Sequence, residues 1–287
     1  MDRDRIKKIL SLYGTEAKKS LGQHFLVSLS VVETMVRTAE ICEDDTILEI
    51  GPGLGVLTEG LASSSAREII LCEKDRKFCE YLKGEFKNKK FKIICDDALL
   101  LIPNLQVKSP ARNASGIAGA GGPFKVISNL PYNISSPVII SLLTVCPTLP
   151  DKMVVMVQRE VADRFIAAPH DSNRGILTAF LELFGSVKII EKVPKNFFYP
   201  APEVDSAVIE LKDIKPLPFS AKYALKIIKL SFSGKRKMIK NSLFSSLKIP
   251  PEKAADLAQK SGINLDMRPE ELTRDQWMAL IQNTADL

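Results

Sequence analysis

The chain has 287 residues, of which 45% are apolar, 26% charged and 7% aromatic. This composition excludes a wholly disordered chain, and the length fits one large domain or a large domain with a small one. The 40 Lys and Arg residues exceed the 34 Asp and Glu residues by six, too small an excess to identify a partner by itself. The first ten residues, MDRDRIKKIL, predict no signal peptide because they have mixed charge and no long apolar core. The longest apolar stretch, Pro137 to Pro150, is well short of the ~20 residues that span a bilayer, so we expect no membrane segment.

The cysteine and histidine content argues against a metal site. The five cysteines are scattered, mostly within apolar runs, and form no C-x-x-C pair. His24 and His170 are the two histidines. We therefore expect no zinc site or other metal, no disulfide framework, and a reducing cytoplasm as the location.

From about residue 46, short apolar runs alternate with helical patterns. Short β-branched runs without polar alternation are typical of parallel strands that are covered on both faces. Strands that alternate with helices indicate an open, doubly wound α/β sheet. The predicted strands are 46–50, 68–72, 91–95, 124–128 and 152–158, and the predicted helices between them are 57–64, 78–86 and 136–145.

The pattern changes after two more helical stretches, at 159–167 and 174–184. Residues 186–193 and 204–211 resemble strands joined by a proline-rich loop, which predicts an antiparallel edge of the sheet. Residues 213–218 resemble a linker, and helices follow at 220–232, 236–247, 251–261 and 273–283. We expect a first domain at 1–213 and a helical one at 218–287, with a flexible insertion at about 107–123 that is rich in Gly, Ala and Ser.

The first predicted strand runs into the glycine cluster LEIGPGLG at residues 48–55. Glycine lets the backbone approach a ligand closely and lets a helix start tightly, but the same pattern also occurs in ordinary tight turns. The dinucleotide spacing G-x-G-x-x-G is absent, because position 56 is Val56. The cluster alone is weak evidence for a ligand site.

Acidic side chains follow the next two strands. Glu73 lies about twenty residues beyond the glycine cluster and is suited to bonding ribose hydroxyls, and Asp97 is suited to an adenine amino group. Each carboxylate alone is an ordinary loop acid. Because open α/β sheets bind ligands at the carboxyl ends of their strands, the three strand ends together favour a nucleoside site.

The tetrapeptide Asn129, Leu130, Pro131 and Tyr132 follows the fourth strand. An aromatic amine is a poor nucleophile because its lone pair is delocalised into the ring. An Asn oxygen and a main-chain carbonyl that accept both amine protons would free that lone pair for methyl transfer, and proline would stiffen the turn. A sulfonium donor is already activated, so positioning suffices and no strong general base is needed. Tyr132 is suited to stacking on the base.

Two further segments fit base methylation. The proline-stiffened loop FYPAPEVDS at 198–206 carries Phe198, which is suited to the other face of a stack around an extruded base. Simple capping of an edge strand is the alternative explanation of this loop. The segment 18–26, KKSLGQHFL, is basic and carries Gln and His at a turn. A lone His in such a place is usually structural.

The basic residues are unevenly placed. Between Lys215 and Lys248 the chain has nine Lys or Arg residues and no Asp or Glu. By charge alone, lysines on a solvated helix face explain this run best. Beside a site that methylates a base, it becomes a candidate surface for RNA.

Together these motifs, with the helical FSGKRKMIKNSLF at 232–244, resemble the ribosomal RNA adenine dimethyltransferases. The resemblance runs in order from about residue 18 to 275, and the GKRKMIKNSL segment matches the small-subunit branch. It implies a Rossmann-like, class I methyltransferase sheet with a small all-helical C-terminal domain. It also implies a monomeric enzyme that uses S-adenosyl-L-methionine to dimethylate two adjacent adenosines in the 3′-terminal hairpin loop of 16S ribosomal RNA, during assembly of the small subunit.

The resemblance also implies roles for individual residues. Tyr132 and Phe198 would hold the target base, and Asn129 would touch both the donor and the target amine, with Leu130 and Pro131 completing the catalytic tetrapeptide. The expected donor-binding residues are Gln23, His24, Leu26, Gly51, Gly53, Glu73, Asp97 and Asn129. The expected RNA-binding residues are Lys235, Arg236, Lys237 and Lys240.

The chain departs from the family pattern at two places. His24 stands where the family often has Asn, and the insertion at 107–123 is longer than expected. Three alternatives share parts of this pattern: an Erm-type methylase of 23S RNA that gives macrolide resistance, a non-enzymatic binding module, and a small-molecule methyltransferase. The segment at 234–243 argues against the Erm-type methylase. A non-enzymatic module would not need the intact Asn129, Glu73 and Asp97, and a small-molecule methyltransferase would not need the basic run.

Overall fold

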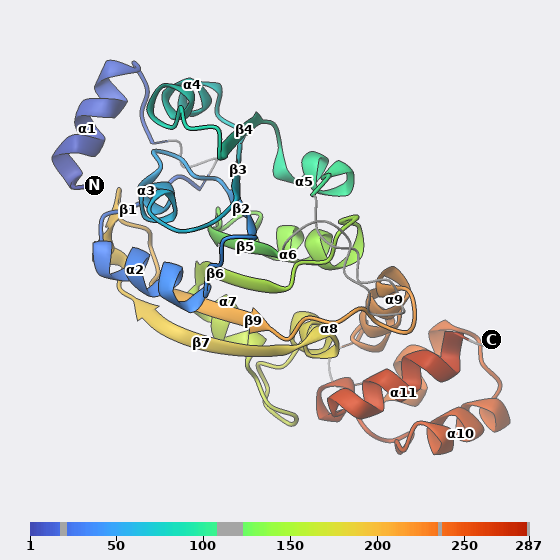
Figure 1. The fold of residues 1–287 in the computed structure, drawn as a ribbon. Helices are drawn as coiled ribbons and strands as arrows, with labels where there is room; N and C mark the ends of the chain where they lie inside the picture. Colours follow the sequence, from blue (N-terminus) through green and yellow to red (C-terminus); the bar gives the residue numbers. More distant parts are fainter. Residues whose placement is uncertain (18–21, 108–122, 235–236, 286–287) are drawn as a thin grey trace. The chain divides into compact units, whose positions relative to one another are not determined.

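The computed structural model describes residues 1–17, 22–107, 123–234 and 237–285 (Figure 1). Its main sheet has seven strands in the order β4–β3–β2–β5–β6–β9–β7. The first five of these are parallel: β4 (Phe91–Cys95), β3 (Glu68–Glu73), β2 (Thr46–Ile50), β5 (Phe124–Asn129) and β6 (Lys152–Gln158). β9 (Ser206–Lys212) is antiparallel to β6, and β7 (Ser186–Val193) lies beyond it at the edge. The predicted α/β sheet with an antiparallel edge is confirmed.

The central strands form because their apolar runs are covered on both faces. All five residues of β2 are buried, as are the first five of β5. The connections contain α3 (Val56–Ala62), α4 (Arg76–Glu85), α5 (Ala98–Leu101), the 3₁₀ turn η2 (Ile102–Asn104) and α6 (Ser135–Thr144). Asp75 and Asp97 cap α4 and α5 by accepting main-chain N–H bonds. Since the strands are parallel, their carboxyl ends meet at one edge of the sheet.

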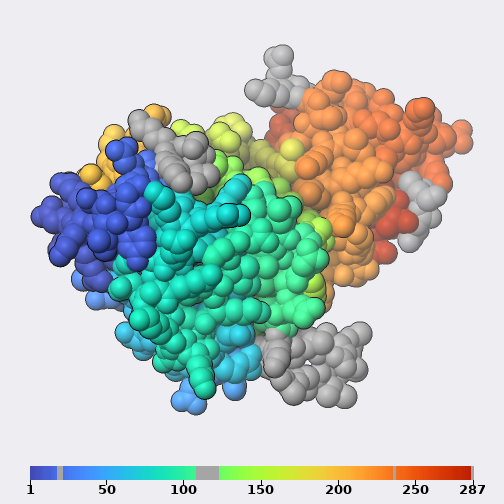
Figure 2. Space-filling view, turned by 90° about the horizontal axis from the view of Figure 1, so that it is seen from above, coloured from blue at the N-terminus to red at the C-terminus, as the bar shows by residue number. Residues whose placement is uncertain are grey.

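The N-terminal segment contains three further elements. These are α1 (Arg3–Leu12), the short strand β1 (Phe25–Leu26) and α2 (Leu29–Thr38). β1 pairs antiparallel with β8 (Phe198–Tyr199), which follows the 3₁₀ turn η3 (Lys195–Phe197). α1 lies beside α4, as Figures 1 and 2 show, and the rings of Tyr13 and Tyr81 meet edge to face at 5.6 Å.

The chain divides into two compact units. The first is Met1–Ala162 with Lys188–Ile214, and the second is Asp163–Val187 with Lys215–Leu287. The expected linker at 213–218 therefore spans a boundary, but the expected first domain includes 163–187, which the contacts assign to the second unit. The second unit contains the end of α7 (Arg159–Phe165), together with α8 (Ile176–Phe184), α9 (Ala221–Ser231), α10 (Pro251–Lys260), the 3₁₀ turn η5 (Pro269–Glu271) and α11 (Arg274–Ala285).

The physical reason for this assignment is the packing of α8. Its side chains are apolar and buried on most sides, and it packs against α9 and α11. Arg174, which is 4% exposed, forms an ion pair with Glu182 at 2.6 Å and donates to the main-chain oxygen of Leu272 at 2.9 Å. A local helical pattern does not reveal these long-range partners.

The helix predicted at 236–247 is shorter and differs in type. Lys240–Phe244 forms a π-helical turn, η4. At its start, the main-chain N–H groups of Ile239 and Lys240 donate to the oxygens of Met267 and Leu265, which lie in the loop after α10. Lys235 and Arg236 lie outside the described residues, as does 108–122 of the predicted insertion.

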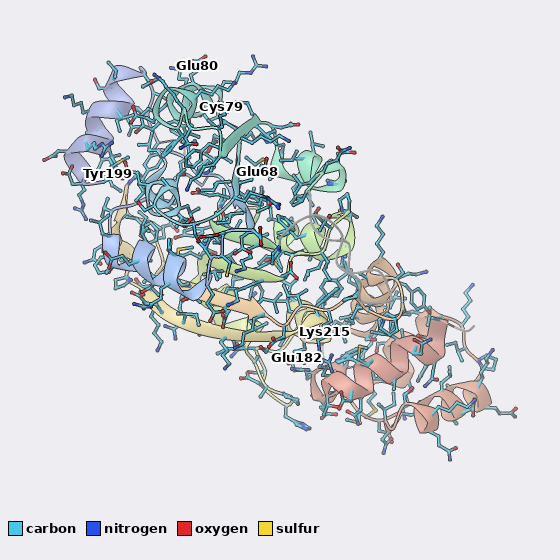
Figure 3. All side chains as sticks on the ribbon, viewed as in Figure 1. Glu68, Cys79, Glu80, Glu182, Tyr199 and Lys215 are labelled. Carbon is cyan, nitrogen blue, oxygen red and sulfur yellow. A yellow bond between two sulfur atoms is a disulfide. The ribbon has the colours of Figure 1, made fainter. Side chains whose placement is uncertain are left out.

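The cysteine prediction was wrong for one pair. A disulfide joins Cys79 of α4 to Cys95 of β4, whose Cα atoms lie 5.9 Å apart because α4 packs beside β4. Figure 3 labels Cys79 in this helix. Within the described ranges, no cluster of three His, Cys, Asp or Glu residues is suited to a metal ion. No helix in the described part of the chain is long and apolar enough to cross a membrane.

Candidate active site

A cleft that is open to solvent at its mouth lies at the carboxyl ends of β2, β3, β4 and β5. Every described element that lines it belongs to the first compact unit. The cleft brings together all the residues predicted to bind a donor: Gln23, His24, Leu26, Gly51, Gly53, Glu73, Asp97 and Asn129. Leu130, Pro131 and Tyr132 line it as well.

The glycine turn after β2 lies directly against the tetrapeptide turn after β5. Gly51 has φ +66°, a conformation that side chains rarely adopt, and a Cβ atom on it would lie 2.9 Å from Cγ of Pro131. Beneath this contact, the Ser128 hydroxyl donates to the Ile50 main-chain oxygen at 2.6 Å. The two turns therefore form one continuous floor, and a larger residue at Gly51 would force them apart.

Glu73 is buried at the end of β3, and main-chain groups hold both of its oxygens. One oxygen accepts from Gly53 N at 3.0 Å and the other from Asp75 N at 2.8 Å. Burial raises the pKa of Glu73 above its usual value, and the two main-chain hydrogen bonds oppose that rise. The carboxylate thus fixes the glycine turn while it faces the cleft.

Asp97 lies at the end of β4, where it begins α5 and pairs with a lysine. One oxygen accepts from Leu99 N at 2.9 Å, and the other lies 2.8 Å from Nζ of Lys74. The bond from Lys74 holds the pKa of Asp97 below its usual range, so the group is an ionised acceptor. Glu73 and Asp97 thus line the same cleft in different environments. Glu73 is buried, and Asp97 is partly exposed and ion-paired.

Sequence reasoning missed several lining residues. Glu49, within β2, is 1% exposed and accepts a bond from Thr58 Oγ1 at 2.7 Å, and burial raises its pKa to about 8. The sequence does distinguish Glu49, because an acidic residue inside an otherwise apolar strand requires an explanation. Lys74, Cys72 and Asn133 also line the cleft, but nothing in their local pattern distinguishes them.

The tetrapeptide is anchored to two strands of the sheet, β6 and β9. The Leu130 side chain is 1% exposed, and its N–H donates to the Met156 oxygen of β6 at 3.2 Å. Tyr132 hydrogen bonds to Ser206 of β9 through its hydroxyl, and burial raises the pKa of Tyr132. The Asn129 amide Nδ2 donates to the His24 main-chain oxygen at 3.5 Å, which leaves Oδ1 as the acceptor of this side chain.

Phe198 does not line the cleft in this structure. Its side chain is 1% exposed and belongs to the buried hydrophobic core, in β8 opposite Leu26. Stacking of Phe198 on a base therefore stays a prediction, and it would require the side chain to be uncovered.

Lys237 and Lys240 are the described members of the predicted RNA-binding set, and both lie in the second compact unit. Lys240 forms an ion pair with Asp266 at 2.5 Å, an acid from outside the acid-free run. This pairing neutralises part of the charge that the sequence assigned to the run.

The arrangement is suited to group transfer between a nucleoside-bearing donor and an amine. The cleft offers acceptors for ribose hydroxyls and an exocyclic amine at two strand ends. It also offers an Asn acceptor, a rigid proline turn and an aromatic ring at the third.

Comparison with known proteins gives a consistent result. Residues 14–286 match the family model described as ribosomal RNA adenine dimethylase. A ribosomal RNA small subunit methyltransferase A from Lachnoclostridium phytofermentans is 34% identical over 280 residues, covering 95% of this chain and 93% of that protein. One of the same name from Leuconostoc mesenteroides is 38% identical over 245 residues, covering 84% and 80%.

Two solved structures share the fold. A dimethyladenosine transferase from Plasmodium falciparum superposes with a TM-score of 0.72 at 23% identity, covering 92% of this chain and 98% of that one. The 23S rRNA methyltransferase ErmE superposes with a TM-score of 0.64 at 23% identity, covering 90% and 98%. At this level of identity, both likenesses establish the fold alone.

Proposed function

Because the chain belongs to the ribosomal RNA adenine dimethylase family, we propose that it dimethylates the exocyclic amines of two adjacent adenosines in the 3′-terminal hairpin loop of 16S ribosomal RNA. S-adenosyl-L-methionine is the methyl donor. The observation that carries the proposal is the joining of Glu73, Asp97 and Asn129 in one cleft, at three strand ends, with the Gly51–Pro131 contact as its floor.

The cleft residues fit the donor. Glu73 offers a carboxylate to ribose hydroxyls, and Asp97, held ionised by Lys74, offers an acceptor to the adenine amine. Without a Cβ atom, Gly51 leaves room for the donor's methionine part beside Pro131. When bound, the donor supplies an activated methyl group.

Asn129 acts on the target amine. Its Nδ2 donates to the His24 carbonyl, so in the first transfer its Oδ1 accepts one proton of the amine, while a main-chain carbonyl of the tetrapeptide accepts the other; in the second transfer one acceptor holds the remaining proton. These hydrogen bonds draw the nitrogen lone pair out of conjugation with the ring and aim it at the methyl group. Each transfer forms an N–CH3 bond, breaks the donor's S–CH3 bond to leave S-adenosylhomocysteine, and releases one amine proton to solvent. Pro131 limits the freedom of the turn, so the acceptors are in place before the reaction.

The target base and the RNA backbone are held by separate groups. Tyr132 stacks on the base, and Phe198 provides the opposite face once it is uncovered. Lys235, Arg236, Lys237 and Lys240 contact phosphates. The protein acts as a monomer in the cytoplasm, on the assembling small ribosomal subunit.

Labelled donor, supplied with under-methylated small subunits or with under-methylated large subunits, tests this proposal. Label should enter RNA of the small subunits alone. Asn129→Ala should lose methyl transfer by about a thousandfold or more while binding the subunits as the natural chain does, because the acceptor acts on the reacting amine. Label in the large subunits alone would instead identify an Erm-type enzyme, and unchanged turnover of Asn129→Ala would contradict the mechanism.

A further inference from the structure

The donor-binding segment and the proline-rich loop are joined by a small sheet, although they are about 175 residues apart. In the β1–β8 pair, Phe25 lies opposite Tyr199 and Leu26 opposite Phe198. The Val27 N–H extends the pairing by donating to the Phe197 oxygen at 2.8 Å. Tyr199, labelled in Figure 3, lies beside α1, and Nζ of Lys7 is 5.6 Å from the centre of its ring. The residue just before β1 is therefore next to the loop that follows β8.

That residue is His24, and its imidazole bonds the loop. Nδ1 lies 2.8 Å from the main-chain oxygen of Pro200. Because a carbonyl oxygen can only accept, Nδ1 carries the proton and donates it. This is a hydrogen bond between the donor-binding segment and the loop predicted to hold the target base.

His24 also contacts the tetrapeptide at two points. Its ring stacks on the ring of Tyr132, with centroids 5.7 Å apart and planes 22° apart. Its main-chain oxygen accepts from Nδ2 of Asn129 at 3.5 Å. One residue thus touches the amide and the aromatic ring of the tetrapeptide and, at the same time, the Pro200 carbonyl.

We propose that His24 is a positioning residue, which holds the Pro200 loop and the Tyr132 ring in register with Asn129 so that the target base enters in one orientation. The inference rests on the proposed function and assigns His24 a role on the RNA side of the cleft, beyond the donor contact expected for it. The imidazole covers one face of the Tyr132 ring, so the base would stack on the other face.

The shape of histidine separates its two contacts. In Asn, the side-chain Nδ2 occupies nearly the position of the histidine Nδ1, so His24→Asn keeps the bond to Pro200 and loses the ring. His24→Phe keeps a ring against Tyr132 and loses the bond, and His24→Ala loses both. His170→Asn is the matched control, because His170 is an exposed histidine in the other compact unit.

Hydrogen exchange of the segment 195–206 tests the link independently of catalysis. His24→Phe and His24→Ala should exchange these amides about three- to tenfold faster, the effect of losing one hydrogen bond. His24→Asn and His170→Asn should match the natural chain. Equal exchange in all variants would overturn the link, even if the protein methylated no ribosomal RNA.

Steady-state kinetics test whether this link affects the use of the RNA substrate. For methylation of under-methylated small subunits, KM should rise about three- to tenfold in His24→Phe and His24→Ala, and His24→Asn should restore most of it. Calorimetry of S-adenosylhomocysteine binding to the same variants measures any donor contact of the His24 side chain separately, and we expect the KM for subunits to rise by a larger factor than this Kd. If the Kd for S-adenosylhomocysteine rose about three- to tenfold while the KM for subunits stayed unchanged, His24 would be a donor contact only. Absence of methylation by the natural chain would refute the proposed function instead, and the exchange result would still decide the link.

Discussion

Gly51 and Pro131 meet at the floor of the cleft, where a Cβ atom on the glycine would lie 2.9 Å from the proline Cγ. They come from different turns, one after β2 and the other after β5. The contact ties the site expected to bind the donor to the site expected to bind the target. The distance between methyl donor and acceptor therefore depends on a residue that has no side chain.

Gly51→Ala should impair both stability and catalysis. The positive φ and the contact with Pro131 predict a loss of about 1–3 kcal/mol in the free energy of unfolding. Methyl transfer should fall about a hundredfold, because the two turns are displaced. Gly84→Ala is the matched control: Gly84 lies within α4 with no atom within 4 Å of a Cβ, so this change should be neutral or stabilising. Urea unfolding and turnover of the two variants test this, and equal effects would contradict the packing argument.

Glu73→Ala should weaken donor binding. The change removes the carboxylate expected on the ribose and also releases the Gly53 N–H, so the Kd for S-adenosylhomocysteine should rise about tenfold or more. Glu68, labelled in Figure 3, lies at the opposite end of the same strand and makes Glu68→Ala the control. Calorimetry that gave Glu73→Ala the affinity of the natural chain would remove the ribose role.

Glu49 should make stability depend on pH. Its pKa is raised from 4.5 to about 8 by burial, so the folded chain keeps a proton that the unfolded chain loses above pH 4.5. The stability that comes from this proton is complete below pH 4.5 and is lost as the pH rises to about 8. Glu49→Gln keeps an acceptor for Thr58 but cannot ionise, so its unfolding midpoint in urea should fall less between pH 6 and pH 8. Parallel curves for the two proteins would show that Glu49 does not titrate in this range.

The basic run should act through phosphate contacts. Charge reversal of Lys235, Arg236 and Lys237 should weaken binding to small-subunit RNA and flatten the dependence of the binding constant on salt, because fewer counterions are released. Lys253→Glu is a control on exposed α10, outside the acid-free run. Filter binding across a salt series measures both effects, and an unaltered slope in the triple variant would return the run to a role in solubility.

The sequence predicted those features that local patterns determine. The apolar runs specified the five parallel strands, and the parallel order then placed Glu73, Asp97 and Asn129 at one edge. Contacts between distant segments were not predictable in this way. The bond from His24 to Pro200 spans 176 residues, and the pairing of Lys240 with Asp266 depends on the loop that follows α10.

The helices α7 and α8 illustrate the same limit. Their periodicity predicted helices, and the structure has them, but their place in the chain suggested the first domain. The buried Arg174, which bonds Glu182 of α8 and the Leu272 carbonyl, joins α8 to the C-terminal part of the chain, and α7 lies across the boundary between the two units. Phe198 is a second case in which a distant contact decides the outcome. Its motif suggested an exposed ring, but the ring is buried in β8, which pairs with β1.

We infer that this cleft dimethylates two adjacent adenosines of the small-subunit RNA. Mass spectrometry of 16S RNA fragments, after incubation of under-methylated small subunits with the protein and S-adenosyl-L-methionine, tests it most directly. We expect two methyl groups on each of two neighbouring adenosines in the 3′-terminal hairpin loop and no other change in that RNA. Methyl groups on other nucleotides, or an unmodified hairpin loop, would contradict it.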